Sequence, residues 1–372
     1  MGEKCEVLMG QYLYKEIKDY LTELITANKN IPNYRLPSEN QLAIKFSTTR
    51  ITAKRALEEL QEEGYIYRVH GKGSFISPEA TNRSELKGKD FVCVLLPNIE
   101  SLFIATLVDG IRQTLRAAGF HLIILSESVD ELNSNNLIKR IVNLGIKGII
   151  VFPNSQARYN KDLLLLALNK FPVVFIDRTL HDFDVSSVTS DHNGMGKKAT
   201  NLLFSRGCRH VGFISMPAEY SSSIAKRIAG YEKAHTENGF RILPEQMLFV
   251  TKQDKDQVAH IAEFFRKNPE LDGLLSYGGS VGYNVYRAIL KEGISVPKQL
   301  KVIFFDDEYA QYDDLLPFSP TCVSQHSTEI GQKAAELILG YITNHSVTID
   351  KILIDCDIIE RESTLGRSTQ LI

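Results

Sequence analysis

Residues 35–76 constrain the fold of this chain most, because they predict two short helices followed by a glycine-rich hairpin. Ser38, with Gln41 three positions later, forms a capping box that begins the first helix. Thr49 can cap the second helix, which ends at Gly64. The apolar residues of the second helix recur at helical spacing and define its buried face: Ala53, Ala56, Leu57 and Leu60.

The other face of the second helix and the following hairpin are polar and basic. That face consists of Thr49, Arg50, Thr52 and Lys54. Two alternating segments, 65–67 and 74–76, flank His70-Gly71-Lys72-Gly73, whose glycines let the backbone pass close to another surface. In a helix-turn-helix, such a face enters the major groove, where arginine reads guanine and lysine or threonine contacts phosphate. We therefore predict a winged helix-turn-helix that binds double-stranded DNA.

The charge balance restricts any DNA contact to a local surface. The whole chain has a net charge of -2, and residues 1–77 are close to neutral. The acids gather at 58–63, whereas the bases lie where the helix start and the wing would converge: Lys45, Arg50, Lys54, Arg55, Arg68 and Lys72. Such residues are often only solvated charges, and similar small motifs occur in proteins that never bind DNA. The extent of the pattern over a whole domain favours DNA binding.

Three motifs in this region occur together: Leu36-Pro37-Ser38-Glu39, Arg50-x-Thr52-x-Lys54 and Gly71-x-Gly73-x-Phe75. With them, residues 11–77 resemble the winged helix-turn-helix of the GntR family. Asn40 departs from the family pattern, because an arginine that contacts phosphate is common there, so the phosphate contact at Asn40 is in question. The resemblance implies DNA contacts at Thr49, Arg50, Thr52, Lys54, His70 and Gly71, and we add Arg35, Ser38, Asn40 and Lys72 from the same motifs.

The remaining chain is long enough for a larger second domain. Of the 372 residues, 43% are hydrophobic and 24% charged, which is typical of a globular protein. Residues 78–90 lack an apolar period, so we expect a DNA-binding domain over 1–77, a linker over 78–90 and a large domain over 91–372. No signal peptide or membrane-spanning run is present, and we expect a cytoplasmic protein without a membrane partner. Five cysteines without a Cys-x-x-Cys pair predict buried, reduced thiols: Cys5, Cys93, Cys208, Cys322 and Cys356.

Short apolar runs alternate with amphipathic helical segments from residue 91 onward. Such alternation predicts an α/β fold with parallel sheets, and continuous apolarity predicts strands that are buried on both faces. The predicted strands are 91–96, 121–125, 148–152, 173–176, 210–214, 271–275 and 301–305. Ligands bind beyond the carboxyl ends of such strands. At these ends lie Ser101, Pro153-Asn154, Asp177-Arg178 and, after the last predicted strand, Asp306-Asp307.

A second set of motifs is spread over residues 91–365. It includes Phe175-Ile176-Asp177-Arg178, Ser190-Asp191-His192, Arg227 with Gly230-Tyr231, Phe305-Asp306-Asp307, Thr321 with Gln325, and Arg361-Glu362-Ser363-Thr364. These residues resemble the effector domain of the LacI family, which is similar to periplasmic sugar-binding proteins. The resemblance implies two subdomains with parallel sheets around a ligand. A GntR-type reader joined to a LacI-type sensor resembles the arabinose-repressor subgroup of carbohydrate regulators.

The LacI resemblance also implies which residues bind the effector. Carboxylate and guanidinium groups hydrogen-bond sugar hydroxyls, and an aromatic ring covers the apolar face of the sugar. The positions implied are Phe103, Asp177, Arg178, Arg227, Asp306 and Gln325. Ser101 stands where an asparagine is common, and Gly278-Gly279 replace an Asn-Asp pair. The smaller side chains would admit a bulkier or phosphorylated ligand, or shift contacts to Tyr277 and Ser280.

The candidates differ in strength. An Asp-Arg pair at a strand end, such as Asp177-Arg178, is often a structural ion pair, and Asp191 is expected to be structural. Arg227 and Asp306 are the stronger effector-binding candidates. The full predicted effector set is Ser101, Phe103, Asp177, Arg178, Arg227, Tyr277, Asp306 and Gln325.

Other classes of function fit less well. Doubly wound sheets host many enzymes, so an enzyme or a cytoplasmic sugar-binding protein that uses the winged helix as an interaction module is the alternative. However, no phosphate-binding loop or nucleophile elbow is found, and the histidines at 192, 210, 260 and 326 have neither metal-ligand spacing nor a nucleophile partner. We therefore expect no catalytic residue, metal or cofactor. We predict a homodimeric, ligand-responsive repressor of carbohydrate utilisation genes, released from operator DNA by a sugar or sugar phosphate.

Overall fold

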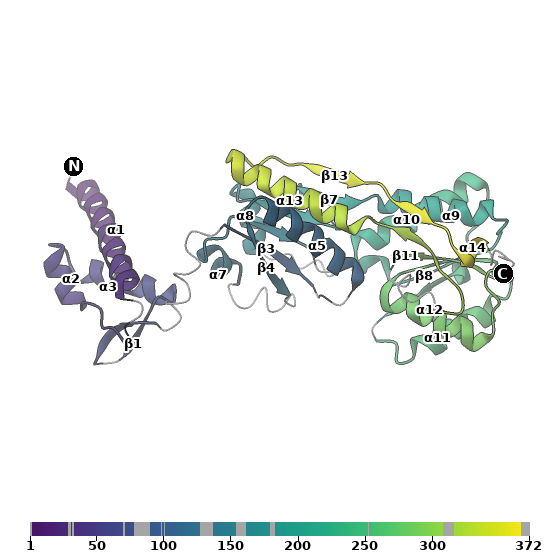
Figure 1. The fold of residues 1–372 in the computed structure, drawn as a ribbon, viewed down its shortest axis with the longest axis horizontal. Coiled ribbons are helices and arrows are strands. Elements are labelled where there is room, and N and C mark those ends of the chain that lie inside the picture. Colours follow the sequence, from purple (N-terminus) through teal and green to yellow (C-terminus); the bar gives the residue numbers. More distant parts are fainter. Residues whose placement is uncertain are drawn as a thin grey trace. The chain divides into compact units, whose positions relative to one another are not determined.

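The computed structural model describes residues 2–28, 31, 33–69, 71–77, 90–97, 99, 101–126, 137–153, 161–178, 183–251, 253–307 and 316–365. The chain divides into two compact units, residues 1–90 with 139–145 and residues 91–138 with 146–372. Figure 1 shows both units with their elements labelled. The predicted linker lies outside the described residues except for Asp90, as do His70 and Asn154.

The first unit is a winged helix-turn-helix. It consists of α1 (Gly2–Asn28), α2 (Glu39–Lys45), α3 (Arg50–Glu62), β1 (Ile66–Val69) and β2 (Gly73–Ile76). The predicted capping box is confirmed, because the Gln41 N–H donates to Ser38 Oγ at 3.4 Å and the Ser38 N–H donates to Gln41 Oε1 at 2.8 Å. Thr49 caps α3 as predicted. The antiparallel strands β1 and β2 form the wing, and one core joins them to the three helices.

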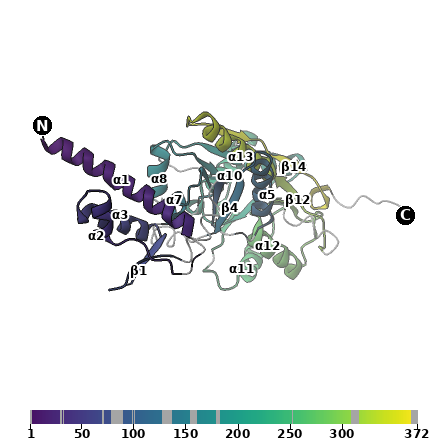
Figure 2. The same ribbon diagram turned by 60° about the vertical axis from the view of Figure 1, so that its left-hand side comes forward.

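The second unit contains two six-stranded sheets. The first sheet has the order β13-β7-β6-β5-β3-β4, and all its strands are parallel. Its strands are β3 (Phe91–Leu96), β4 (His121–Ser126), β5 (Gly148–Val151), β6 (Val173–Ile176), β7 (Ser187–Ser190) and β13 (Lys351–Ile354). The chain also forms α5 (Leu102–Ala117), α7 (Leu137–Asn143), α8 (Lys161–Leu168) and α13 (Ser327–Asn344). Helices α5 and α13 pack side by side (Figure 2).

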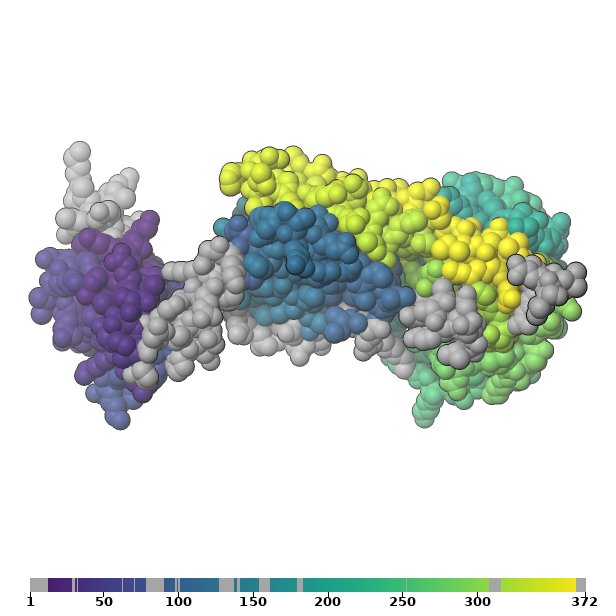
Figure 3. Space-filling view, in the orientation of Figure 1, coloured from purple at the N-terminus to yellow at the C-terminus, as the bar shows by residue number. Residues whose placement is uncertain are grey.

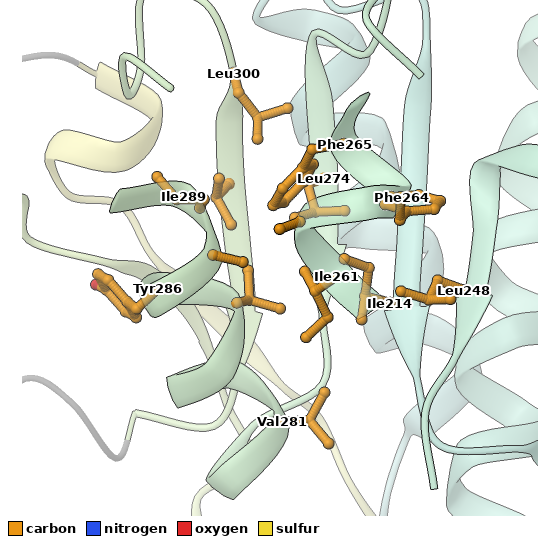
Figure 4. Packing of buried hydrophobic residues seen from close by; sticks show 14 of the residues in the cluster. Ile214, Leu248, Ile261, Phe264, Phe265, Leu274, Val281, Tyr286, Ile289 and Leu300 are labelled. Atoms are coloured by element: carbon orange, nitrogen blue, oxygen red, sulfur yellow. The ribbon is translucent and has the colours of Figure 1, made fainter. Parts of the chain in front are cut away.

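The second sheet has the order β14-β12-β11-β10-β8-β9, in which only β14 is antiparallel to its neighbour. Its strands are β8 (Val211–Ser215), β9 (Met247–Phe249), β10 (Gly273–Ser276), β11 (Lys301–Phe305), β12 (Thr321–Ser324) and β14 (Asp357–Ile359). The helices around it are α9 (His192–Ser205), α10 (Ser222–Asn238), α11 (Gln257–Lys267), α12 (Gly279–Glu292) and α14 (Glu362–Leu365), with short turns η1 (Ala218–Tyr220) and η2 (Pro244–Gln246). Figure 4 shows Ile261 of α11, Tyr286 of α12 and Leu274 of β10 within one buried cluster.

The chain passes between the two sheets three times. It leaves β7 of the first sheet for α9, returns from β12 of the second sheet to α13, and crosses again from β13 to β14. The residues from α13 onward, coloured yellow-green to yellow, form a continuous band in Figure 3. Each sheet therefore receives an edge strand from the last part of the described chain.

The sequence located seven strands of this unit and missed five others. The missed strands are β7, β9, β12, β13 and β14, so Asp306-Asp307 do not follow the last strand as predicted but follow β11. The expectation of strands buried on both faces is wrong for β4, because it lies at a sheet edge and Ile124 is 46% exposed. Cys93, Cys208, Cys322 and Cys356 are free and buried, in agreement with the prediction. Of the helices that the structure describes, none could span a membrane.

Candidate DNA-binding face and effector site

Several predicted DNA contacts gather around one hollow of the first unit. This hollow has a volume of about 580 Å³ and is lined by the start of α2, the start of α3 and the wing, including Ser38, Asn40, Arg50 and Gly71. Arg35 lies beside the wing, since a Cβ built on Gly73 would be 3.0 Å from Arg35 Nε. Lys72 is exposed at the hairpin turn, and Lys54 is half-exposed and pairs with Glu58 on its own helix at 3.5 Å.

The two threonines of the α3 face are engaged in the cap. The Thr49 side chain accepts the Thr52 N–H at 3.2 Å, and the two hydroxyl oxygens lie 3.0 Å apart. Thr52 is therefore oriented by Thr49, at the end of the helix where the backbone N–H groups attract anions.

Glu39 is a residue of this face that the sequence prediction missed. Its carboxylate accepts from Arg50 Nε at 2.9 Å and lies 3.4 Å from Nη1 of Arg68 on the wing. The Arg50 side chain is 70% exposed, whereas that of Glu39 is 19% exposed. Within the part of the chain that the structure describes, Nε and Nη2 of Arg68 have no hydrogen-bond partner. Glu39 thus joins the recognition helix to the wing and orients two guanidinium groups.

Two bases of the predicted cluster do not belong to this face. The Lys45 ammonium lies 3.5 Å from the centre of the Tyr20 ring, and the Arg55 guanidinium lies 5.4 Å from that of Tyr14. Both rings belong to α1, so these cations hold the long helix by cation–π contacts. Helical spacing alone placed them with Arg50, because the sequence does not show where α1 packs.

In the second unit, two aspartates end strands of the two sheets in an unusual conformation. Asp177 follows β6 with φ 64°, and Asp306 follows β11 with φ 75°. Non-glycine residues rarely adopt this left-handed region, and such residues concentrate at functional sites. Burial raises the pKa of both carboxyl groups, and the charge of Arg227 opposes this rise in each case. The positive charge of Arg227 therefore influences both carboxyl groups.

Arg227 lies on α10 and is almost entirely buried. Its guanidinium lies 4.8 Å from the ring centre of Phe305 and 5.6 Å from that of Tyr277. Gly196 lets α9 approach α10 here, because a Cβ at this position would lie 2.2 Å from the Arg227 carbonyl oxygen. Among the described residues, Arg227 Nε has no acceptor. A buried guanidinium with an unused N–H is able to donate to a bound hydroxyl.

Arg178 and two aromatic rings border the Asp177 side of the site. Arg178 Nε donates to Asp177 Oδ2 at 3.2 Å, and its guanidinium lies 5.0 Å from the centre of the Phe152 ring. Phe103, at the start of α5, meets the Phe152 ring edge-on at 6.3 Å. Ser101 caps α5 through a hydrogen bond from the Ile104 N–H at 3.2 Å, so its hydroxyl already has a local role.

Gln325 and His192 support the two aspartates. Gln325 Nε2 donates to Asp306 Oδ1, while Oε1 of Gln325 is buried without a partner in the described chain. The His192 ring nitrogen Nε2 lies 2.9 Å from the Asp177 carbonyl oxygen, to which it can only donate. Burial, with the nearby charge of Arg227, lowers the pKa of His192 to about 3. His192 is therefore neutral and buried, and its role at the site was not evident in the sequence.

A pocket of about 140 Å³ brings together three predicted effector residues, Phe103, Asp306 and Gln325. The remaining residues of its wall come from α5, from the turn after β11 and from the passage between β12 and α13: Leu102, Thr106, Asp307, Ser324, His326 and Ser327. Thr106 and Ser327 share a hydrogen bond of 2.6 Å between their hydroxyl groups. No cluster of metal-ligating side chains occurs in the described ranges.

The expectation that Gly278 makes room for a larger ligand is wrong. A Cβ at Gly278 would lie 2.2 Å from the Phe305 carbonyl oxygen and 2.9 Å from Asp306 Oδ2. The space beside this glycine is filled by the Asp306 segment. Glycine is needed at 278 because β11 and the start of α12 approach each other closely.

The chain was then compared with known proteins. Residues 89–362 match the family of periplasmic binding proteins and sugar binding domain of LacI family. This chain belongs to that family. Residues 13–76 match the bacterial regulatory proteins of the gntR family, so the chain is a transcriptional regulator that joins a GntR-type DNA-binding domain to a LacI-type sensor.

Individual relatives agree with this assignment. The chain is 24% identical to an arabinose metabolism transcriptional repressor of Geobacillus stearothermophilus over 94% of its own length and 97% of the relative. Its fold is similar to that of the transcriptional regulator CelR in complex with cellobiose (TM-score 0.65, 21% identity, covering 88% of this chain and 100% of that one). It is also similar to a LacI family regulator of Enterococcus faecium with bound ribose (TM-score 0.62, 20% identity, covering 75% and 100%).

Proposed function

We propose that this regulator is a cytoplasmic homodimeric repressor of carbohydrate utilisation genes, which an uncharged sugar releases from a palindromic operator. The observation that carries the proposal is Arg227, a buried guanidinium beside the rings of Phe305 and Tyr277 whose Nε–H has no acceptor among the described residues. A buried charge is costly unless it has a hydrogen-bonding or charged partner. A sugar would supply such partners, because its hydroxyls can accept from Arg227 and donate to Asp306.

The charge balance of the site supports a sugar over a sugar phosphate. Of the two guanidinium groups at the site, Arg178 already pairs with Asp177 at 3.2 Å, and Arg227 lies against the rings of Phe305 and Tyr277. A phosphate would add negative charge without a surplus cation to receive it. Phe103, exposed to the pocket beside Asp306 and Gln325, would cover the apolar face of the sugar.

The effector is tested by calorimetric titration with arabinose, ribose and cellobiose, the sugars associated with the similar proteins described above. We expect one of them to bind the full chain, and its phosphate ester, a 5-phosphate for arabinose or ribose and a 6-phosphate for cellobiose, to bind more weakly. Tighter binding of the phosphate would reverse the charge argument. Binding of none of the three would refute this choice of ligand while leaving the DNA-binding proposal standing.

DNA binding is proposed to use the hollow between α2, α3 and the wing, with Arg50 reading a base and Lys72 contacting phosphate. Arg50→Ala should weaken operator binding by about 1–3 kcal/mol and relax sequence preference. Lys72→Ala should weaken all sequences alike and reduce the salt dependence by one phosphate contact. Arg266→Ala, at an exposed ion-paired arginine of the second unit, is the control and should leave a gel-shift titration unchanged.

The link between the two activities follows from reciprocity. A sugar that weakens operator binding must itself bind more weakly in the presence of operator, by the same factor. Sugar affinity is therefore to be measured with and without operator DNA. Equal affinities would show that the bound sugar is not the inducer.

A further inference from the structure

The conformation of Asp306 requires an explanation beyond its own contacts. Its backbone is left-handed with φ 75°, although it carries a side chain. Its N–H donates to the Val323 carbonyl at 3.1 Å, and its carboxylate accepts from Gln325. A residue stays in this sparsely populated region only when its surroundings hold it there. The next residue, Asp307, is itself held in place and so restrains the backbone of Asp306.

Asp307 is fixed by a two-pronged ion pair with Arg361. The Arg361 nitrogens Nη1 and Nη2 donate to Asp307 Oδ1 at 2.7 Å and to Oδ2 at 2.9 Å. Nη1 also donates to the Pro320 carbonyl at 2.9 Å and lies 3.2 Å from Cys322 Sγ. The side chains of Arg361 and Asp307 are 19% and 28% exposed, so water screens the pair only in part. A planar guanidinium that meets a carboxylate at both oxygens fixes its orientation as well as its distance.

Arg361 is itself anchored firmly. It follows β14, which pairs with β12, and its N–H donates to Thr321 Oγ1 at 2.8 Å. Two residues later, the Ser363 hydroxyl donates to the Val302 carbonyl of β11 at 2.6 Å. The segment 357–365 is thus tied to the strand that ends at Asp306 and to its neighbour. Arg361 reaches Asp307 from a rigid support.

We propose that Arg361 is a positioning residue for effector binding: by holding Asp307, it keeps Asp306 in the left-handed conformation that directs its carboxylate to Gln325 and toward Arg227. The inference rests on the proposed role of Asp306 as an effector ligand. It adds a residue that touches neither the ligand nor any residue predicted to bind it. Preorganisation of a ligating group raises affinity because the bound geometry need not be formed at the moment of binding.

The chain offers a matched control on the adjacent residue. Arg206 donates to Glu360 Oε2 through Nε at 3.0 Å and Nη2 at 2.7 Å. This pair ties the same C-terminal segment to α9, and none of its contacts involves Asp306 or Asp307. Arg206→Met therefore removes a comparable ion pair from the same segment without touching the proposed support. Arg361→Met removes the ion pair with Asp307. Arg361→Lys keeps the positive charge but cannot donate to both carboxylate oxygens with a planar guanidinium.

The test combines two measurements on the full chain. Calorimetry with arabinose, ribose and cellobiose should show affinity for the bound sugar reduced about tenfold or more in Arg361→Met, partly restored in Arg361→Lys and unchanged in Arg206→Met. Operator affinity without sugar should equal that of the wild type in all three variants. Crystal structures of the unliganded variants should show that Asp306 leaves its left-handed conformation, or its contact with Gln325, in Arg361→Met only.

The outcomes separate this inference from the proposed function. If the wild type binds none of the three sugars, the proposed ligand fails, and the crystal structures still decide the role of Arg361. If Asp306 keeps its conformation and its Gln325 contact in Arg361→Met, the positioning role is overturned. If Arg361→Met does not fold, Arg361→Lys carries both measurements, and wild-type sugar affinity with an unchanged Asp306 in that variant overturns the proposal. Equal loss of sugar affinity in Arg206→Met would show a general effect of the C-terminal segment.

Discussion

Asp177 and Asp306 end strands in the two sheets of the sensor and share a left-handed backbone, yet their side chains have different surroundings. The Asp177 carboxylate has Arg178 at 3.2 Å and the His192 ring at 3.7 Å, and its carbonyl oxygen is bonded to His192 as well. Within the described residues, the Asp306 carboxylate has one hydrogen bond, from Gln325. An ionised carboxylate can accept about four hydrogen bonds.

The difference indicates that one aspartate of the site has mainly a structural role and the other mainly a binding role. The Asp177 carboxylate is paired with the adjacent Arg178, and its backbone carbonyl accepts from His192, so removal of Asp177 should affect folding more than binding. Asp306 retains capacity for a ligand, and its backbone is supported from the next residue instead. Similar positions at two strand ends therefore do not predict similar functions, and the following substitutions measure how far the two aspartates differ.

The largest effect on binding is expected from Asp306→Ala. Removal of this carboxylate leaves Gln325 Nε2 buried without its acceptor and removes a proposed ligand contact, so affinity for the inducing sugar should fall by about 3 kcal/mol. Calorimetric titration of the variant measures the loss. Unchanged operator affinity without sugar serves as the check that the DNA-binding domain is intact. Wild-type sugar affinity in this variant would move the ligand away from β11.

Gly278→Ala should displace Asp306 without changing that residue. The new methyl group would overlap the Phe305 carbonyl oxygen and approach Asp306 Oδ2, so it should displace the segment and lower the free energy of unfolding by about 2 kcal/mol, with a loss of sugar affinity. Gly340→Ala on α13 is the control, because no atom lies within 4 Å of its added Cβ. That substitution should raise stability by about 1 kcal/mol in urea unfolding. A stable, sugar-binding Gly278→Ala variant would contradict the tight approach of β11 and α12.

His192 contacts the Asp177 carbonyl oxygen, and it should make stability depend on pH. Burial lowers the pKa of His192 to about 3, so the folded protein binds no proton at His192 over the range where the unfolded chain does. The stabilisation is complete above the unfolded value of about 6.5 and is lost as the pH falls toward 3. Relative to His192→Gln, the wild type should lose up to about 1.4 kcal/mol per pH unit between pH 6 and pH 4. Urea unfolding at several pH values measures the two slopes, and parallel slopes would show that His192 does not titrate in this way.

Asp177→Asn should have the smallest effect on sugar binding. The amide keeps the size of the side chain and one acceptor oxygen, so affinity should fall by about 1 kcal/mol or less. Calorimetry on this variant beside Asp306→Asn gives the direct comparison. A loss as large as that of Asp306→Asn would abolish the distinction between the two strand ends.

The fold of the DNA-binding domain could be predicted closely from the sequence, because the residues that determine it interact locally. The Ser38–Gln41 box, the Thr49 cap and the glycines of the wing all act within a few residues, and each is present in the structure. Glu39 was missed as a partner of Arg50 and Arg68, since these contacts join residues on three different elements.

In the sensor, prediction failed where polar strands or distant partners were involved. Strand β7 is fully buried although half of it is serine, because Ser190 donates to the Gln325 carbonyl at 3.3 Å, 135 residues away. The candidates Arg227, Asp306 and Gln325 came from a family pattern. Arg361 belongs to the same pattern, but its contact with Asp307 could not be predicted, because the two residues are 54 positions apart and meet only once β14 pairs with β12.

The late position of β13 and β14 in the chain bears on how each molecule is synthesised. Domains generally fold in order as they leave the ribosome. The DNA-binding domain is complete once residue 77 has emerged. Each sheet of the sensor, in contrast, remains without one edge strand until residues 351–359 have emerged. A translation product that stops before residue 351 would therefore carry a finished DNA-binding domain and no finished sensor. In the life of each molecule, we expect the capacity to recognise DNA to precede the capacity to be regulated.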